Sequence, residues 1–147
     1  MSAAEKARIP GLSLSEDTKL TFQLARDVAA RLGFRYVGTE HVLLALVGPD
    51  CPGRQLIESY NLDPELVVRQ IQSIAVEKEI PTDPEKIVYT YRTRKILESA
   101  IAEARKREAP QVTLEHLLFG MVKEGEGYAA GILALNGLTE KSLRAHV

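Results

Sequence analysis

The stretch GTEHVLLALV, Gly38 to Val47, decides the fold because the chain repeats its pattern as TLEHLLFGMV, Thr113 to Val122. The two Glu-His pairs lie 75 positions apart, and the same offset aligns apolar residues upstream of them. Downstream the offset becomes 76 and the apolar residues align again. A register held over about seventy residues indicates a duplicated unit rather than a chance match.

Each copy of the repeat is expected to form four helices. Ser15 and Thr90 are good N-caps for the first helix of each copy. Gly33 ends that helix in the first copy, and Pro110 marks the break in the second. The Glu-His helix that follows is apolar nearly all round, so it is predicted to lie at the centre of the protein. The residues expected in the interior are Val42, Leu43, Leu46, Leu117, Leu118 and Met121.

These patterns predict an all-α fold of about eight helices in two tandem four-helix repeats, packed as one pseudo-twofold bundle. Repeat one is assigned to residues 14–76 and repeat two to residues 89–147. Residues 77–88 contain two prolines and are the expected linker, and residues 1–13 are read as an N-terminal arm. One body is favoured over two domains because each half is small for an independent core.

Composition excludes several classes of function. The 147 residues carry 19 Lys and Arg against 20 Asp and Glu, which argues against a surface designed for nucleic acid or anionic membrane. No apolar run approaches the ~20 residues of a membrane helix. The single Cys51 excludes an internal disulfide and fits a reducing compartment. We therefore expect a cytoplasmic monomer that contacts neither nucleic acid nor membrane.

Segments of both repeats resemble a known protein family. YTYRTRKILESA from Tyr89, followed by VTLEHLLFGMVKEGEGYAAGIL from Val112, resembles the Clp amino-terminal repeat. LSEDTKLTFQLA from Leu14 and RLGFRYVGTEHVLLALV from Arg31 resemble its first copy. This domain stands at the front of Clp-type AAA+ unfoldases. The resemblance covers about residues 14–147 and implies the pseudo-symmetric helical bundle of that family.

The resemblance also implies a function without catalysis. Domains of this family recruit substrate polypeptides and adaptor proteins for a Clp ATPase and its protease. The chain has no G-x-x-x-x-G-K-[ST] motif, so nothing in it is expected to bind ATP. We expect a non-enzymatic regulator of Clp delivery, with no cofactor and no metal. Its Met-Ser-Ala-Ala start favours a free-standing protein, and the alternative is the N-terminal part of a full-length Clp ATPase.

Four residues are the candidate binding site. In some members of the family, a Glu and the Thr that opens the preceding helix frame a pocket for phosphorylated arginine. Transferred by position, this pairs Ser15 with Glu40 and Thr90 with Glu115. A carboxylate can bind a guanidinium bidentately, and helix-start amides suit phosphate. The alternative is that each Glu only stabilises its helix start, by about 0.3–1 kcal/mol. The second site is expected to be the better one because it keeps the sequence EGEGYAA.

Other residues are candidates for metal binding or reactivity, and two other functions remain as alternatives. His41 and His116 are expected to be partly buried and to donate hydrogen bonds to the backbone, since no convergent ligands suggest a metal. Cys51 lies in a loop between two prolines and is expected to be exposed and unactivated. A small helical DNA-binding protein and a Glu-His hydrolase are the rival functions. Balanced charge argues against the first, and a missing nucleophile motif argues against the second.

Overall fold

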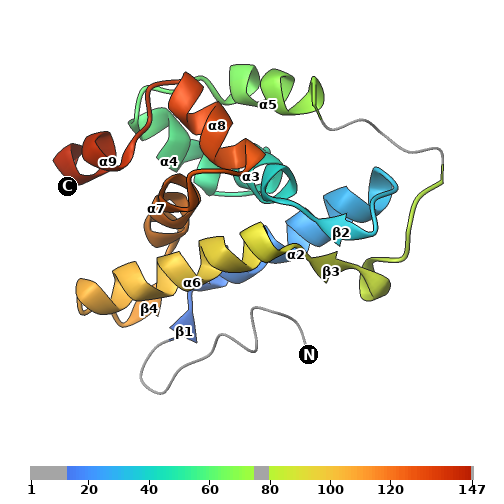
Figure 1. The fold of residues 1–147 in the computed structure, drawn as a ribbon, viewed down its shortest axis with the longest axis horizontal. Coiled ribbons are helices and arrows are strands. Elements are labelled where there is room, and N and C mark those ends of the chain that lie inside the picture. The colour runs from blue at the N-terminus through green and yellow to red at the C-terminus, as the bar shows by residue number, and fades with distance from the viewer. Residues whose placement is uncertain (1–12, 75–79, 147) are drawn as a thin grey trace.

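The computed structural model describes residues 13–74 and 80–146 (Figure 1). Within them the chain forms eight α-helices, four in each repeat, as the sequence predicted. The first four are α2 (Glu16–Arg31), α3 (Thr39–Val47), α4 (Gly53–Ser59) and α5 (Pro64–Gln72). The second four are α6 (Tyr91–Lys106), α7 (Leu114–Glu124), α8 (Tyr128–Leu135) and α9 (Glu140–His146).

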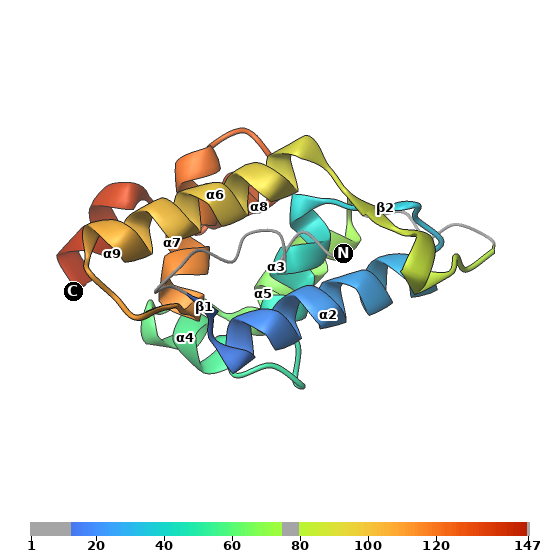
Figure 2. The same cartoon turned by 90° about the horizontal axis from the view of Figure 1, so that it is seen from below.

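The helices are arranged in layers around the two Glu-His helices. The long helices α2 and α6 lie on one side of the molecule, and α3 and α7 pass between them and the shorter helices (Figures 1 and 2). Helix α3 contacts α6 and α8 of the other repeat, while α7 contacts α2 and α4. Each repeat therefore packs its central helix against the partner repeat, which explains why both helices are apolar on nearly every face.

The core matches the prediction from helical periodicity. The six interior residues expected from the sequence are all fully buried in the structure. Gly120 in α7 sits where that helix crosses α6, so close that a Cβ atom there would collide with the Ile96 carbonyl oxygen. The absence of a side chain at Gly120 lets the two helices approach at this point.

The first helix of each repeat begins with the same hydrogen bonds. The Ser15 hydroxyl accepts from the Thr18 amide at 3.1 Å, and the Thr90 hydroxyl accepts from the Thr93 amide at 3.2 Å. Both predicted N-caps are thereby confirmed. The ends of these helices are also equivalent, although their sequences differ. Gly33 adopts a left-handed φ of 85° after α2, and Glu108, 75 positions later, adopts a φ of 55° after α6.

In the described part of the chain, four two-residue strands, which the sequence did not predict, connect the repeats. Strand β1 (Ser13–Leu14) pairs in parallel with β4 (Gln111–Val112), and β2 (Tyr36–Val37) pairs in parallel with β3 (Val88–Tyr89). Each pair joins one strand from each side of the duplication. The pairs are too short for periodicity to reveal them, since a two-residue segment shows no alternation.

Side-chain hydroxyls extend both strand pairs. The Thr18 hydroxyl donates to the Val112 carbonyl at 2.9 Å, and the Thr93 hydroxyl donates to the Val37 carbonyl at 2.9 Å. Both threonines are buried, so these bonds satisfy carbonyls that lie between the repeats. The start of each long helix is thus fixed against the segment that leads into the Glu-His helix of the other repeat.

Two predicted segments fall partly outside the described part of the chain. All but the last residue of the expected arm lies there, as do residues 77–79 of the expected linker. The rest of the linker contains a short 3-10 turn at Pro84–Lys86, labelled η1, and leads into β3. Arg26 of α2 donates a hydrogen bond to the Pro84 carbonyl at 3.0 Å.

Candidate functional site

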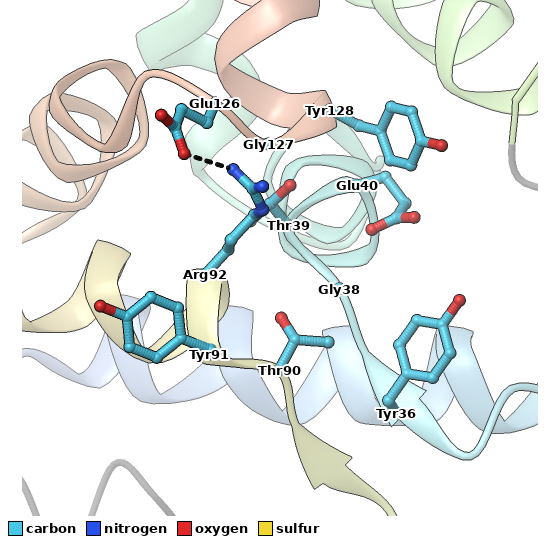
Figure 3. A pocket seen from close by; sticks show the side chains of 10 residues that line it. All are labelled: Tyr36, Gly38, Thr39, Glu40, Thr90, Tyr91, Arg92, Glu126, Gly127 and Tyr128. Carbon is cyan, nitrogen blue, oxygen red and sulfur yellow. Dashed lines mark hydrogen bonds and ion pairs between the residues drawn. The ribbon is translucent and has the colours of Figure 1, made fainter.

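The candidate site is a pocket of about 530 Å³ between the two repeats. Three helix starts meet there, those of α3, α6 and α8 (Figure 3). The lining residues are Tyr36, Gly38, Thr39, Glu40, Thr90, Tyr91, Arg92, Glu126, Gly127 and Tyr128. Repeat one supplies the residues before and within the start of α3, and repeat two supplies the others.

The pocket combines predicted residues in an unexpected way. The sequence paired Ser15 with Glu40 and Thr90 with Glu115, but the structure brings Thr90 and Glu40 to one pocket. The reason is the crossed strand pairing, because β2 leads into α3 and lies beside β3, which leads into α6. Ser15 instead lies beside β4, where its amide donates to the Val112 carbonyl at 3.0 Å. The structure therefore gives the pocket one residue from each transferred pair, Glu40 from the first and Thr90 from the second.

Glu40 is the most buried charged residue of the pocket, with 6% of its surface exposed. Its carboxylate lies over Gly38, where an added Cβ atom would occupy the same space as the carboxylate. Burial raises the pKa of Glu40, and the hydrogen bond from its own backbone amide partly offsets that rise. No ion pair reaches this carboxylate among residues 13–74 and 80–146. A buried acid without a cation is costly in a folded protein, so Glu40 is a candidate ligand-binding group.

Tyrosines flank the Glu40 carboxylate. Figure 3 shows Glu40 between Tyr36 and Tyr128, both of which are exposed. Burial first, and then the charges of Glu40 and Tyr128, raise the pKa of the Tyr36 hydroxyl. The Tyr36 ring is held in an edge-on contact with Phe34, at 5.4 Å between ring centres. The third tyrosine, Tyr91, lies below Lys95, whose ammonium is 5.8 Å from the ring centre.

The opposite wall carries one guanidinium, which is paired with two acids. Arg92 extends from α6 toward Glu126, at 3.0 Å, and also lies 3.4 Å from Glu124 (Figure 3). The other oxygen of Glu124 accepts a hydrogen bond from the Gly127 amide at 2.7 Å. The segment EGEG, Glu124 to Gly127, thus supplies both partners of Arg92.

Hydroxyls of both repeats complete the pocket. The Thr90 hydroxyl donates to the Thr93 hydroxyl at 2.9 Å while it caps α6. Across the pocket, the Thr39 hydroxyl accepts from the Ala129 amide at 3.2 Å, so a residue of α3 caps the first turn of α8. The bond between Thr39 and Ala129 therefore joins the start of α3 to the start of α8.

The pseudo-equivalent position around Ser15 and Glu115 has different chemistry. Glu115 is exposed, unlike Glu40. The positions equivalent to Gly38, Tyr36, Tyr91 and Arg92 hold Thr113, Gln111, Glu16 and Asp17. Tyr36, Tyr91 and the guanidinium of Arg92 are therefore replaced by polar or acidic residues. The Ser15 hydroxyl, which caps α2 and lies 2.8 Å from the Thr18 hydroxyl, repeats the arrangement at Thr90.

The two histidines bond to the backbone at the starts of their helices. They accept these hydrogen bonds, whereas the sequence led us to expect that they would donate them. His41 Nδ1 accepts from the Gly38 amide, and His116 Nδ1 accepts from the Thr113 amide, both at 2.9 Å. The proton of neutral His41 therefore resides on Nε2, which has no hydrogen-bond partner in the described structure. Burial lowers the pKa of His41 to about 4, so the ring is neutral at pH 7.

Cys51 is buried rather than exposed, which corrects the sequence expectation. Its Sγ lies 3.2 Å from the Thr21 hydroxyl and 3.4 Å from the Gly53 amide.

Within the residues that the structure describes, no group of three or more His, Cys, Asp and Glu side chains is placed to hold a metal ion. In the same residues, no helix is long and apolar enough to cross a membrane.

Comparison with known proteins decides the family. A family model described as the Clp repeat (R) N-terminal domain matches this chain twice, over residues 13–88 and 88–147. The chain belongs to the Clp repeat N-terminal domain family. The double match has the same cause as the repeated Glu-His helix, since each copy of the model spans one copy of the duplicated unit.

The curated relatives are the corresponding regions of much longer Clp proteins. The chain is 33% identical over 135 residues to the negative regulator of genetic competence ClpC/MecB of Bacillus subtilis strain 168, covering 90% of this chain and 16% of that protein. It is 36% identical over 131 residues to the ClpA homolog of Porphyra purpurea, an ATP-binding subunit of the Clp protease, covering 84% and 15%. This Clp repeat chain therefore spans about a sixth of the length of these relatives.

Solved structures support the fold. The N-terminal domain of the chaperone ClpD from Arabidopsis thaliana matches with a TM-score of 0.69 and 21% identity, over 90% of this chain and 93% of that one. The N-domain of ClpV from Vibrio cholerae matches with a TM-score of 0.74 and 16% identity, over 90% and 81%. Both neighbours are N-terminal domains of Clp proteins.

Sequence reasoning missed most of the residues that line this pocket of the Clp repeat domain. Tyr91 and Arg92 directly follow the predicted N-cap Thr90, and Tyr128 directly follows the EGEG turn. The sequence did contain a signal for Tyr91 and Tyr128, because an exposed aromatic residue at a helix start does not contribute to the core. Tyr36 gave no such signal, since its position beside the pocket depends on the strand pair that joins the repeats.

Proposed function

We propose that this Clp repeat domain is a non-catalytic docking module, which binds substrate polypeptides or adaptors of a Clp ATPase and so delivers or competes for Clp substrates. We place this role in the cytoplasm. The pocket at Glu40 and Thr90 would take a basic side chain of the bound polypeptide, unmodified or phosphorylated on arginine. The single observation that carries the proposal is the buried Glu40 carboxylate, which lines the pocket and has no cationic partner among the residues that the structure describes.

The surroundings of Glu40 support a polypeptide ligand. The pocket opens between exposed side chains, among them Tyr128 with 58% and Tyr91 with 65% of their surface accessible. Tyrosine supplies contact area and a hydroxyl at low entropic cost, which is why it is enriched where proteins bind one another. Nearby Val88 is also exposed, at 65%, and extends the apolar surface beyond the pocket.

A titration with peptides tests this function. Labelled peptides with a single central basic residue are added to wild type, Glu40→Gln and Glu115→Gln, and binding is followed by NMR chemical shifts. We expect shifts at the starts of α3, α6 and α8, and weaker binding to Glu40→Gln only. Glu115→Gln is the matched control because it removes the equivalent, exposed acid of the other repeat. Equal binding by all three proteins, with Glu40→Gln folded, would refute the proposed site.

A further inference from the structure

Helix α9 lies at one end of the molecule in both views, and charged side chains attach it to its neighbours (Figures 1 and 2). We infer that Glu103 of α6 and Arg144 of α9 form an ionic latch, which lets α9 detach and reattach while the rest of the bundle stays folded. Detachment uncovers the ring of Phe119 on α7. The latch uses none of the residues that line the pocket, so it is independent of the proposed function.

The apolar attachment of α9 is small. Within residues 140–145 of this helix, Leu143 is the one buried residue, whereas the equivalent helix α5 buries Pro64, Val67 and Ile71. A helix of seven residues is not stable in water without tertiary contacts. Elements with few buried apolar side chains also open at a lower free energy than the core. The helical state of α9 therefore depends on its charged contacts.

The charged contacts of α9 reach two other helices. The guanidinium nitrogens of Arg144 lie 3.4 and 3.5 Å from the two carboxylate oxygens of Glu103. The same guanidinium covers the ring of Phe119, at 4.6 Å from the ring centre. The carboxylate of Glu140 lies 3.2 Å from Arg144 and 3.6 Å from the ammonium of Lys123 in α7. This cluster thus ties α9 to both α6 and α7.

Glu103 is buried and has two cationic partners, of which only one belongs to α9. Arg107 of α6 itself lies at 2.6 Å, closer than Arg144 at 3.4 Å. Burial raises the pKa of Glu103, but the hydrogen bonds and charges of both arginines outweigh it and hold the pKa below its ordinary value. Removing the sole partner of a buried charge is costly. Because Arg107 stays in place when α9 leaves, detachment does not leave Glu103 unpaired, and Arg144 is the exchangeable partner.

Repeat one shows that the fold does not require these charges. The positions equivalent to Glu103, Arg107, Phe119 and Arg144 hold Val28, Leu32, Leu44 and Val68. Leu32, Leu44 and Val68 are half-buried and pack against the core. Apolar residues commonly stabilise a fold as well as a buried ion pair does, or better. The attachment in repeat two therefore responds to ionic strength, whereas the apolar one in repeat one does not.

Hydrogen exchange of the purified chain, measured at the amides of α9 and α5, tests the latch. In about 1 M NaCl, where the screening length is about 3 Å, α9 should exchange about threefold faster while α5 does not change. Arg144→Ala should accelerate the exchange of α9 about tenfold, because it removes both the ion pair and the contact with the aromatic ring. Arg54→Ala is the matched control, since Arg54 of α4 pairs with Glu65 of α5, and it should leave α9 unchanged.

A variant that copies repeat one, with Glu103→Val, Arg107→Leu and Arg144→Val together, should show the converse. Its α9 should exchange more slowly than in wild type, and salt should no longer change the rate. The latch is overturned if α9 and α5 exchange at the same rate at low and high salt, because α9 then opens only with the whole bundle. An Arg144→Ala protein whose α9 exchanges as in wild type, or a copied variant that keeps the salt dependence, overturns it too. If the copied variant does not fold, the measurements on wild type and Arg144→Ala decide.

Discussion

Replacing Gly120 by alanine tests the closest helix contact of the fold. Gly120 lies in α7 at its crossing with α6, and a Cβ atom there would fall inside 3.0 Å of the Ile96 carbonyl oxygen. It would also lie 3.1 Å from the Ala100 amide nitrogen and 3.3 Å from its Cβ. These are largely backbone atoms, which cannot rotate away as a flexible side chain does. Gly120→Ala must therefore move the two helices apart.

The size of the effect follows from two opposing terms. Overpacking a core typically costs about 1–3 kcal/mol, and a clash with backbone places Gly120→Ala at the upper end. Alanine in place of glycine inside a helix returns about 0.5–1 kcal/mol. We therefore expect a net loss of about 2 kcal/mol in the free energy of unfolding.

Gly131 in α8 provides the matched control. It is exposed, and a Cβ atom there would meet nothing within 4 Å. Gly131→Ala should gain about 0.5–1 kcal/mol, because only the helix-propensity term remains. Urea unfolding followed by circular dichroism, with a common m-value, measures both variants. A Gly120→Ala protein as stable as wild type, or more stable, would refute the assignment of this contact.

Four further outcomes are expected. Leu43→Ala or Leu118→Ala should each lower the free energy of unfolding by about 2–5 kcal/mol in urea, since both side chains are fully buried. The pKa of His41 is about 4 in the folded protein, below its ordinary value of 6.5, because the buried ring is held neutral. Its contribution to the free energy of unfolding is therefore complete above pH 6.5 and is lost as the pH falls toward 4, by about 3 kcal/mol in all. His41→Gln should reduce this pH dependence in unfolding measurements, and an unchanged profile would contradict the assignment. Glu108→Gly should stabilise the protein by about 1 kcal/mol in the same assay, because glycine adopts the left-handed φ of 55° without strain. Calorimetry should detect no saturable ATP binding, since the chain lacks a P-loop sequence.

The repeat, the caps and the core could be predicted because each depends on local sequence or on helical periodicity. Ser15 and Thr90 are good N-caps in any context, and the Glu-His helices are too apolar to lie on the surface. The end of α6 shows the limit of such signals. Pro110 predicts a break at that residue, but the left-handed residue is Glu108, at the position where the first repeat has Gly33. Glutamate gives no local indication of this conformation.

The pocket could be predicted only in part because it depends on which segments of the two repeats meet. Alignment of the copies pairs residues that are equivalent, and it suggested that each Glu belongs with the hydroxyl residue of its own repeat. In the structure, hydrogen bonds from Thr90 and Thr93 to the Val37 carbonyl place the start of α6 beside the start of α3. Glu40 therefore meets Thr90, and the difference between buried Glu40 and exposed Glu115 is a tertiary property.

The crossed strand pairs give this single chain the bonding pattern of an isologous dimer. In a two-fold dimer, a patch on one subunit contacts the matching patch on the other, and each contact occurs twice. Here Thr18 with Val112 and Thr93 with Val37 are such a pair of reciprocal contacts. A lone ancestral repeat would have had to associate with a second copy to satisfy the same carbonyls. Because the two repeats are fused in one chain, they need not be identical. The pocket at Glu40 can therefore keep its tyrosines while the equivalent position at Glu115 differs.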